Sequence, residues 1–216
     1  MEYTQKQYAG IIHNHSACSG EGSHPLSVLR QRWASRFQFA AMTEHAEKLT
    51  AEAYASYLRE CDSLSDEQFR FIPGLEIATT SGHMLVLGCR QFIRTRDPSQ
   101  VIKEAAGCVI LLAHPEERHM IPAVLAQANG IEGWNARYMG RHIPPLDWLS
   151  IWRKELLPGQ IMTGGNDIHH VDRKRKIMLL TQSRSMREHD ILEAIKTGHF
   201  IVSNGIFAFT PDGQIF

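Results

Sequence analysis

Short apolar runs recur along the chain and alternate with segments that carry helical signals. The runs are rich in β-branched and aromatic residues, as strands are. The predicted strands are Tyr8–His13, Phe37–Thr43, Phe69–Ile77, His83–Cys89, Val109–Ala113, Gly130–Trp134, Gln160–Thr163, Ile177–Thr181, Phe200–Ser203 and Ile206–Phe209. Repeated alternation of strand and helix is typical of an α/β fold with a largely parallel sheet.

Three of the intervening segments have recognisable helix signals. Ser185–Glu188 has the form of a capping box, and Gly198 follows it as a C-terminal stop. The pair Asp97-Pro98 is typical of an N-cap followed by the first helical residue. A helix capped by Thr50 is expected to run to about Ser65.

The length of 216 residues suggests a single domain over residues 1–216. The alternation fits either a doubly wound sheet or a small barrel. A standard eight-unit barrel needs about 250 residues, so a barrel here would be reduced or distorted. Hydrophobic residues make up 43% and charged residues 21%, which excludes a disordered chain, a coiled coil and a collagen-like fibre.

Charge and cysteine content narrow the class of protein further. Lysine plus arginine number 23, as do aspartate plus glutamate, and this balance argues against a broad nucleic-acid-binding face. The four cysteines form no C-x-x-C pair, which excludes a zinc ribbon and a thioredoxin-like motif. The polar N-terminus lacks the apolar core of a signal peptide, and the apolar runs are too short to cross a membrane. We therefore expect a reduced, cytoplasmic protein without a membrane partner.

Histidine is unusually frequent, with 12 copies, and many of these histidines adjoin the apolar runs. In parallel α/β folds, functional side chains collect at the carboxyl ends of the strands. His83 opens a run instead of closing one. The polar groups that end a run are His13–His15, Thr43–His45, Glu76, His114, Asn135 and Asp167–His169.

His13 and His15 are two residues apart, so in a strand both imidazoles point to the same side and can reach one ion. Asp167 and His169 repeat this spacing after two glycines. Either pair alone is weak evidence, because 12 histidines produce such pairs by chance. Glu76 is more telling, since a carboxylate that ends an apolar run needs a partner when it is buried.

Taken together, the imidazoles and carboxylates at the strand edges are numerous enough for two or three divalent ions. Mixed imidazole and carboxylate ligands suit Zn, Mn or Fe, with Mg less favoured. The candidate ligands that the residues themselves indicate are His13, His15, His45, Glu76, His83, His114, Asp167 and His169.

The motifs H-x-H, T-[DE]-H, G-x-E, G-H, H-P, I-E-x-x-N and G-x-D-x-H follow one another from His13 to His169. This order resembles the PHP (polymerase and histidinol phosphatase) superfamily, and Ile191–Gly205 is similar to the ending of small stand-alone members. The resemblance implies a distorted (β/α)7 TIM-like barrel with a di- or trinuclear metal site. It also implies phosphoester hydrolysis by a metal-bound hydroxide, with no nucleophilic serine or cysteine.

The resemblance also implies how the ligands divide among the ions. One ion would be held by His13, His15, Glu76 and Asp167. Glu76 would bridge to a second ion, which His83 and His114 would also hold. His45 and His169 would hold a third.

Two positions depart from the family pattern. The usual aspartate after H-x-H corresponds to Gly20, so either Glu21 replaces it or the third ion is bound weakly or not at all. Glu44 stands where T-D-H has aspartate, and it would orient His45 or a neighbour.

Arg137 and Arg141 follow Asn135 closely, and one of them is expected to clamp a phosphate, with a solvated loop arginine as the alternative. The charged run Asp172–Lys176 is either a solvated loop or a rim that attracts an anionic substrate. His142 and His170 are both candidates for a general acid, and the sequence does not separate them.

The aromatic and thiol side chains near these motifs have more ordinary interpretations. Trp148 and Trp152 are four residues apart on a predicted helix, which favours core packing. Trp134, next to the I-E-x-x-N motif, could edge the site. Cys18 falls in the loop after H-x-H, but the family pattern does not require it as a ligand.

The leading hypothesis is a metal-dependent phosphoesterase that acts on a small phosphorylated substrate or a short oligonucleotide. The sequence contains neither a G-x-S-x-G elbow nor a P-loop signature. A second hypothesis keeps the metals but places the reaction at a carbamate or another non-phosphate ester. A third is a degenerate, non-catalytic module that binds metal or nucleotide. The loss of aspartate at Gly20 favours that third hypothesis, and the retained ligand types oppose it.

Overall fold

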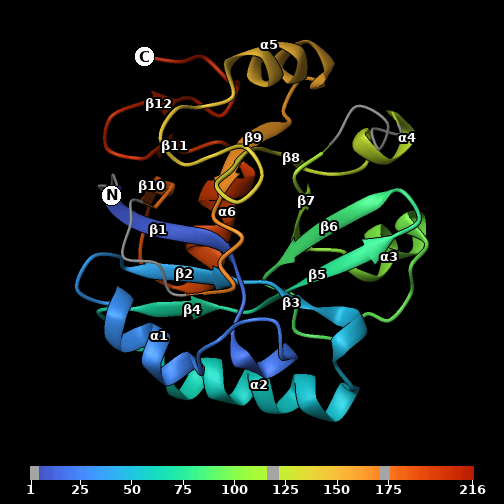
Figure 1. Cartoon of the computed structure of the whole chain (residues 1–216), viewed down its shortest axis with the longest axis vertical. Helices are drawn as coiled ribbons and strands as arrows, with labels where there is room; N and C mark the ends of the chain where they lie inside the picture. The colour runs from blue at the N-terminus through green and yellow to red at the C-terminus, as the bar shows by residue number, and fades with distance from the viewer. Residues whose placement is uncertain (1–4, 116–121, 171–175) are drawn as a thin grey trace.

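The computed structural model describes residues 5–115, 122–170 and 176–216, and these form two mixed sheets with helices around them (Figure 1). The first sheet has the order β12 (Ala208–Phe209), β11 (Phe200–Ser203), β10 (Met178–Ser183), β1 (Lys6–Asn14), β2 (Phe39–Met42) and β4 (Arg70–Ile72). The second has the order β3 (Glu44–His45), β5 (Gly74–Thr79), β6 (Gly82–Leu87), β7 (Val109–Leu112), β8 (Gly130–Asn135) and β9 (Ile161–Gly165). Every predicted strand is therefore present; Phe69–Ile77 is divided into β4 and β5, and β3 was not predicted.

Helices lie on the outside of these sheets. They are α1 (Leu26–Trp33), α2 (Ala51–Ser63), α3 (Pro98–Glu104), α4 (Pro122–Leu125), α5 (Leu146–Glu155) and α6 (Glu188–Lys196), with short 3-10 turns η1 (Ala17–Ser19) and η2 (Ala46–Lys48). Figure 1 shows α1 and α2 along one side of β2 and β4, and α3 outside β5 and β6.

Two of the predicted helix signals are confirmed. The Asp97 carboxylate accepts hydrogen bonds from the backbone N–H groups of Ser99 (2.8 Å) and Gln100 (3.1 Å), and Pro98 is the first residue of α3. The Thr50 hydroxyl accepts from the N–H of Ala53 (3.2 Å) at the start of α2. Each cap satisfies N–H groups that have no partner inside the helix.

The capping box predicted at Ser185–Glu188 is wrong, although Gly198 does end the helix with a φ of 74°. The Ser185 hydroxyl donates to the Asp190 carboxylate (2.6 Å) and accepts from the N–H of Arg187 (3.1 Å), two residues on, where a capping box requires the N–H of Glu188. Glu188 pairs instead with Arg90 across the surface. As a result α6 begins later than predicted, at Glu188.

The prediction of a largely parallel sheet is also wrong. Pairs β1–β2, β2–β4, β3–β5, β7–β8 and β8–β9 are parallel, whereas β1–β10, β10–β11, β11–β12, β5–β6 and β6–β7 are antiparallel. The link between β5 and β6 consists of Thr80 and Ser81 alone, which is too short for the crossover that a parallel pair needs. Strand β6 consequently runs against its neighbours.

Two chain segments pass from one sheet into the other. Only Thr43 separates β2 from β3, and only Pro73 separates β4 from β5. The sheets also meet where β1 approaches the end of β9. There the N–H of Asn166 donates to the carbonyl of Ile12 (3.1 Å), and the N–H of His15 donates to the carbonyl of Ile168 (2.9 Å). These links bring strand ends from both sheets to one place.

The late tryptophans belong mainly to the packed interior. Trp134 is fully buried, packs near Phe209 and donates its indole N–H to the carbonyl of Gly140 (2.7 Å). The expectation that Trp134 edges the site is therefore wrong. Trp152 is buried in the core and stacks with Trp148 at a ring separation of 5.5 Å, which confirms the packing predicted for that pair. Among the described helices, none has both the length and the apolar character to cross a membrane.

Candidate metal centre

Eight of the predicted side chains converge in one place, and we call them the cluster: His13, His15, His45, Glu76, His83, His114, Asp167 and His169. They come from β1, β3, β5 and β6 and from the segments that directly follow β1, β7 and β9. The side chains of His13, His15, Glu76 and Asp167 are almost completely buried. Convergence of this kind follows from strand direction, because strands that run the same way end at the same edge.

His83 reaches the same edge by a different route. It lies near the start of β6, and β6 runs antiparallel to β5. The beginning of β6 therefore lies beside the end of β5, where His83 pairs in register with Ala78. A histidine that opens an apolar run is thus as well placed as those that close one.

Glu76 is the centre of the cluster, and its two carboxylate oxygens face different histidines. Oε1 lies 2.7 Å from His83 Nδ1 and 3.2 Å from His114 Nε2. Oε2 lies 3.1 Å from His13 Nε2 and 3.2 Å from His15 Nε2. His45 Nε2 is also on the Oε2 side, at 3.5 Å. One carboxylate thus contacts two separate sets of imidazoles.

Three groups within the cluster have ligand atoms close enough to share an ion, all within 4.8 Å of one another: His13, His15 and Asp167; His13, Glu76 and His114; and His15, His45 and His169. His13 and His15 each belong to two groups, so the groups form a connected chain. This division overlaps with the one that the family resemblance implies, although His83 is outside all three.

Several buried nitrogens of the cluster have no hydrogen-bond partner among the described residues. They are both ring nitrogens of His15 and Nδ1 of His45, the last of which lies 3.3 Å from the exposed Glu47 carboxylate without a hydrogen bond. His15 Nε2 is 3.2 Å from Glu76 and 3.6 Å from Asp167, but neither contact has hydrogen-bond geometry. Buried polar atoms are normally satisfied, and unpaired imidazole nitrogens beside carboxylates are the donor set of a divalent ion. The residues present therefore fit a metal.

The backbone of the cluster is strained. Among the described residues other than glycine, positive φ occurs at His13 (56°), His114 (28°) and Asp167 (50°), and all three belong to the cluster. Left-handed backbone is costly for a side chain with a Cβ and persists where the surrounding structure enforces it, most often at functional sites.

Glu132 is a site residue that the sequence analysis did not single out, although the I-E-x-x-N motif contains it. It is fully buried, and Oε1 lies 2.7 Å from His13 Nδ1. Oε2 accepts from the backbone N–H of His114 (2.9 Å) and from the Asn135 amide (2.8 Å). The sequence pattern that could have identified Glu132 is an acidic residue inside an otherwise apolar strand. Glu132 fixes the His13 ring so that Nε2 faces Glu76.

Gly165 makes the contact between Glu132 and His13 possible. A Cβ at this position would lie 1.8 Å from Oε1 of Glu132 and 2.8 Å from Cβ of His13. No larger residue fits without moving one of them. The glycines before Asp167 therefore permit the close approach that the sequence suggested.

Glu44 holds a neighbouring segment of the cluster, one of the two roles predicted for it, and not His45. Its carboxylate accepts from the backbone N–H of Ser16 (2.8 Å) and from the hydroxyl of Ser19, and no hydrogen bond joins it to His45 in the described structure. Burial raises the pKa of Glu44 despite these donors. Glu44 therefore holds the loop after His15 and acts on the cluster through that loop.

Electrostatics within the cluster favour positive charge on three of its imidazoles, because the pKa values of His13, His15 and His83 are raised by neighbouring carboxylates. Burial by itself would lower the pKa of His13, but the carboxylates of Glu132 and Glu76 raise it well above its usual range. Burial would likewise raise the pKa of Glu76, but the adjoining histidines hold it well below the ordinary value. The pKa of Asp167 is depressed by His15 and His169 against the effect of its own burial. The site thus requires cations, supplied by protons or by metal ions.

Glu21 lies at the rim and belongs to none of the three ligand groups. Its carboxylate is 3.4 Å from Lys48 Nζ. It still borders a pocket of about 180 Å³ that opens onto the cluster, together with His45 and Asp167. Cys18 is not in the cluster; its thiol approaches Glu60 (3.8 Å), and burial raises its pKa to about 11.

Both predicted phosphate clamps border a cleft of about 490 Å³ beside the cluster, which Lys176 and His170 also line. Arg137 is the closer of the two to the ligands. Its Nη1 lies 2.6 Å from His169 Nδ1 and 3.4 Å from Asp167 Oδ1. Arg141 borders the cleft but not the small pocket over the cluster. In the predicted charged run, 172–175 lie outside the described residues, and Lys176 is buried.

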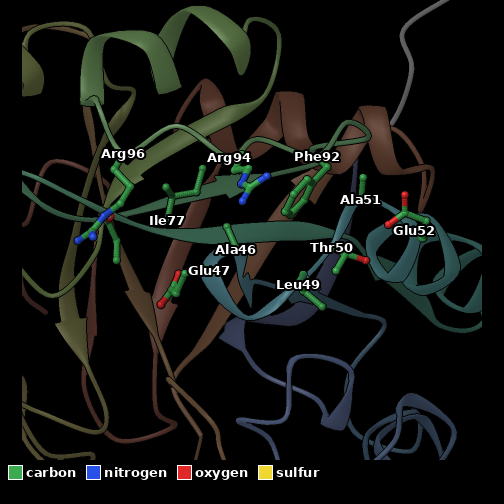
Figure 2. Close-up of a pocket in the computed structure, with 11 residues that line it drawn as sticks. Ala46, Glu47, Leu49, Thr50, Ala51, Glu52, Ile77, Phe92, Arg94 and Arg96 are labelled. Atoms are coloured by element: carbon green, nitrogen blue, oxygen red, sulfur yellow. The ribbon is translucent and has the colours of Figure 1, made fainter.

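A pocket of about 560 Å³ lies elsewhere (Figure 2). Its lining includes Ile77 of β5, Phe92, Arg94 and Arg96, and none of its described lining residues is a histidine. It has no ligand set for a metal. We therefore assign the chemistry to the cluster and its cleft on the basis of chemical composition instead of pocket size.

Comparisons with known proteins bear on the fold. No protein-family model matches the chain, and no curated protein does. Among solved structures, the chain is similar to a two-domain protein from Bacteroides vulgatus that contains a predicted PHP-like metal-dependent phosphoesterase. The TM-score is 0.71 and the identity 16%, over 93% of this chain and 65% of the other. This chain thus spans slightly less than two thirds of that protein.

A second similar structure is that of a predicted metal-dependent phosphoesterase from Bifidobacterium adolescentis. It matches with a TM-score of 0.51 and 15% identity, over 74% of this chain and 87% of the other. At such identities the likeness shows a shared fold. One of these two structures is named PHP-like, after the superfamily that the ordered histidine motifs resemble.

Replacing Glu132 by glutamine tests its positioning role. Glu132→Gln keeps the size of the side chain but removes the charge that orients His13, so metal affinity is expected to fall by roughly 10- to 100-fold. Competition of the protein with a chelator for Mn²⁺ measures this. Glu104→Gln, an exposed change on α3, is the control. Equal affinity in the two variants would contradict the role given to Glu132.

The raised pKa of His13 predicts how the metal-free protein responds to pH. Folded protein binds more protons than unfolded protein above the ordinary histidine pKa of about 6.5. The His13 contribution to stability is therefore complete below that pH and is lost as pH rises through the folded pKa. His15 and His83 also have raised pKa values, whereas the pKa of His45 is lowered and works the other way.

Urea unfolding of chelator-treated protein between pH 6.5 and 8.5 should show a free energy of unfolding that falls with pH, by up to about 1.4 kcal/mol per pH unit for each such group. In excess Mn²⁺ the trend should weaken or reverse, because metal competes with those protons. Stability of the metal-free protein that rises over this range would contradict the electrostatic description.

Proposed function

We propose that this protein is a metal-dependent phosphoesterase whose divalent ions are held by the cluster. The observation that carries the proposal is the division of Glu76 between two sets of imidazoles, His83 and His114 on one oxygen and His13 and His15 on the other. A carboxylate placed in this way fits a bridge between two ions. Ions bound there would lower the pKa of a shared water and polarise the phosphoryl group.

We infer a distorted (β/α)7 TIM-like barrel over residues 1–216 as the scaffold. Support comes from β2 and β3, which continue one another, as do β4 and β5, and from the backbone hydrogen bonds that join β1 to the end of β9. Counting each divided strand once, the chain β1, β2/β3, β4/β5, β6, β7, β8 and β9 returns to its starting strand. Strands β10 to β12 extend the sheet beyond β1.

The ligand groups favour two tightly held ions and a weaker third. The group His15, His45 and His169 is made of imidazoles alone, whereas the other two groups include a carboxylate. Glu21, which might have supplied the missing charge, pairs with Lys48 instead. Zn, Mn or Fe suits such ligands better than Mg does.

Arg137 is the better candidate for the phosphate clamp. It lies over the cluster, within reach of Asp167 and His169, and a guanidinium can grip two phosphate oxygens at once. Its side chain is 47% exposed, so it is accessible from the cleft. A small phosphorylated substrate or a short oligonucleotide would present such a phosphate.

Loss of the central carboxylate is the decisive test. Glu76→Gln is expected to lose the bridged ions and to lower hydrolysis of a phosphoester panel by at least roughly 100-fold, while the circular dichroism stays that of the folded protein. Elemental analysis after incubation with Mn²⁺ or Zn²⁺ counts the ions per chain. The matched control is Glu155→Gln, an exposed site on α5. If Glu76→Gln kept its metal content and its hydrolysis rate, the assignment of Glu76 to the metal site would be wrong.

The clamp has its own test. Arg137→Ala is expected to raise KM for a phosphoester roughly tenfold or more, because a charge-assisted contact to phosphate is lost, and to leave the metal count unchanged. Arg141→Ala should have a smaller effect, and Arg153→Ala, which pairs with Asp212, none. If only Arg141→Ala raised KM, the clamp would be Arg141.

A further inference from the structure

The cluster adjoins a second cleft, of different character from the one that Arg137 and Arg141 border. It has a volume of about 440 Å³ and shares His83, His114 and Tyr138 with the small pocket over the cluster. Apart from Ser81 and Gly82, its remaining described lining is apolar: Leu112, Ala113, Pro115, Met139 and Trp148. Its volume is in the range of pockets that hold small organic ligands.

Tyr138 connects this apolar cleft with the cluster. Its ring centroid lies 4.7 Å from that of His114, and the Arg137 guanidinium lies 5.7 Å from the Tyr138 ring. Tyr138 is also 63% exposed, so its ring is open to a ligand. An accessible aromatic ring therefore lies in direct contact with His114, one of the proposed metal ligands.

Trp148 also lines the cleft, and its ring is held by a second tryptophan. It stacks with Trp152 at 5.5 Å and an interplanar angle of 20°, and Trp152 is buried in the core. A ring fixed in this way loses little conformational freedom when it contacts a ligand. The cleft thus has two aromatic side chains in its lining, Tyr138 and Trp148, and the stacking on Trp152 orders the second of them.

One cleft is lined by cationic side chains and the other by apolar ones, which matches the anionic phosphoryl group and the organic alcohol of a phosphoester. Arg137, Arg141 and Lys176 line one cleft, and Tyr138, Met139 and Trp148 line the other. The cluster is between them, because the small pocket over it shares residues with both. A phosphoryl group held over the cluster would carry its alcohol within reach of the apolar cleft.

We propose that the apolar cleft is a subsite for the organic part of the substrate and that it selects phosphoesters of alcohols bearing an apolar, aromatic ring. The inference rests on the proposed phosphoesterase function. Transfer of a ring from water to this cleft is favourable, and its face can stack on Tyr138 or Trp148. A small or strongly hydrated alcohol gains neither contribution.

The experiment compares benzyl phosphate with methyl phosphate on the metal-loaded full chain. Both have primary alkyl leaving groups of similar reactivity, so a difference in kcat/KM reports the subsite. We expect benzyl phosphate to be preferred by roughly tenfold or more, as burial and stacking of one ring allow. Trp148→Ala and Tyr138→Ala should each reduce the preference. Ile151→Ala, an exposed change on the same helix as Trp148, should preserve it.

Binding separates this inference from the proposed function. Calorimetry with benzylphosphonate and methylphosphonate, which cannot be hydrolysed, measures the subsite even if neither ester is turned over. Tighter binding of benzylphosphonate that is lost in Trp148→Ala would support the subsite in a protein without phosphoesterase activity. Equal binding of the two phosphonates, or equal kcat/KM for the two esters, would overturn it.

Discussion

The charge of Glu76, buried among five imidazoles, is the constraint on which the rest of the site depends. A carboxylate with almost no exposure cannot stay ionised in a protein interior unless positive charge compensates it. The compensating groups come from strands in both sheets, so the fold has to bring distant segments within hydrogen-bond distance of one side chain. The passage of two chain segments from one sheet into the other, together with the reversed β6, achieves this.

The residues that support the ligands are fixed by contacts as close as those of the ligands themselves. Glu132 contacts the His13 ring, the His114 backbone and Asn135 at once, and Gly165 leaves room for it. Glu44 performs a similar task for the loop after His15. The cluster is therefore supported on one side by β8 and on the other by β3. The ordered interior that results contrasts with the exposed Arg137 and Tyr138 above it.

The sequence predicted the cluster better than it predicted the fold around it. The ligand types could be recognised because each one adjoins an apolar run, and chemistry restricts what His and Glu can do there. Periodicity is the same for parallel and antiparallel strands, so the direction of β6 follows instead from the short link between β5 and β6, which the expectation of a parallel sheet overlooked. The capping box at Ser185 failed because its second half, the Glu188 carboxylate, pairs with Arg90, which is 98 positions away in the chain. The role of Glu132 depends on contacts across 119 positions of the chain, and no local pattern reports these.

The left-handed backbone at His13, His114 and Asp167 has a consequence for how such a site can decay. Glycine, asparagine and aspartate adopt this conformation at lower cost than other residues do. A descendant that abandoned metal chemistry would still have to keep the turn at each position. Its surviving substitutions there would be drawn from that short set, while His15, His45 and His83, on ordinary backbone, could change more freely. After loss of function, the residues found at these three positions would therefore still be restricted, by backbone conformation instead of by metal binding.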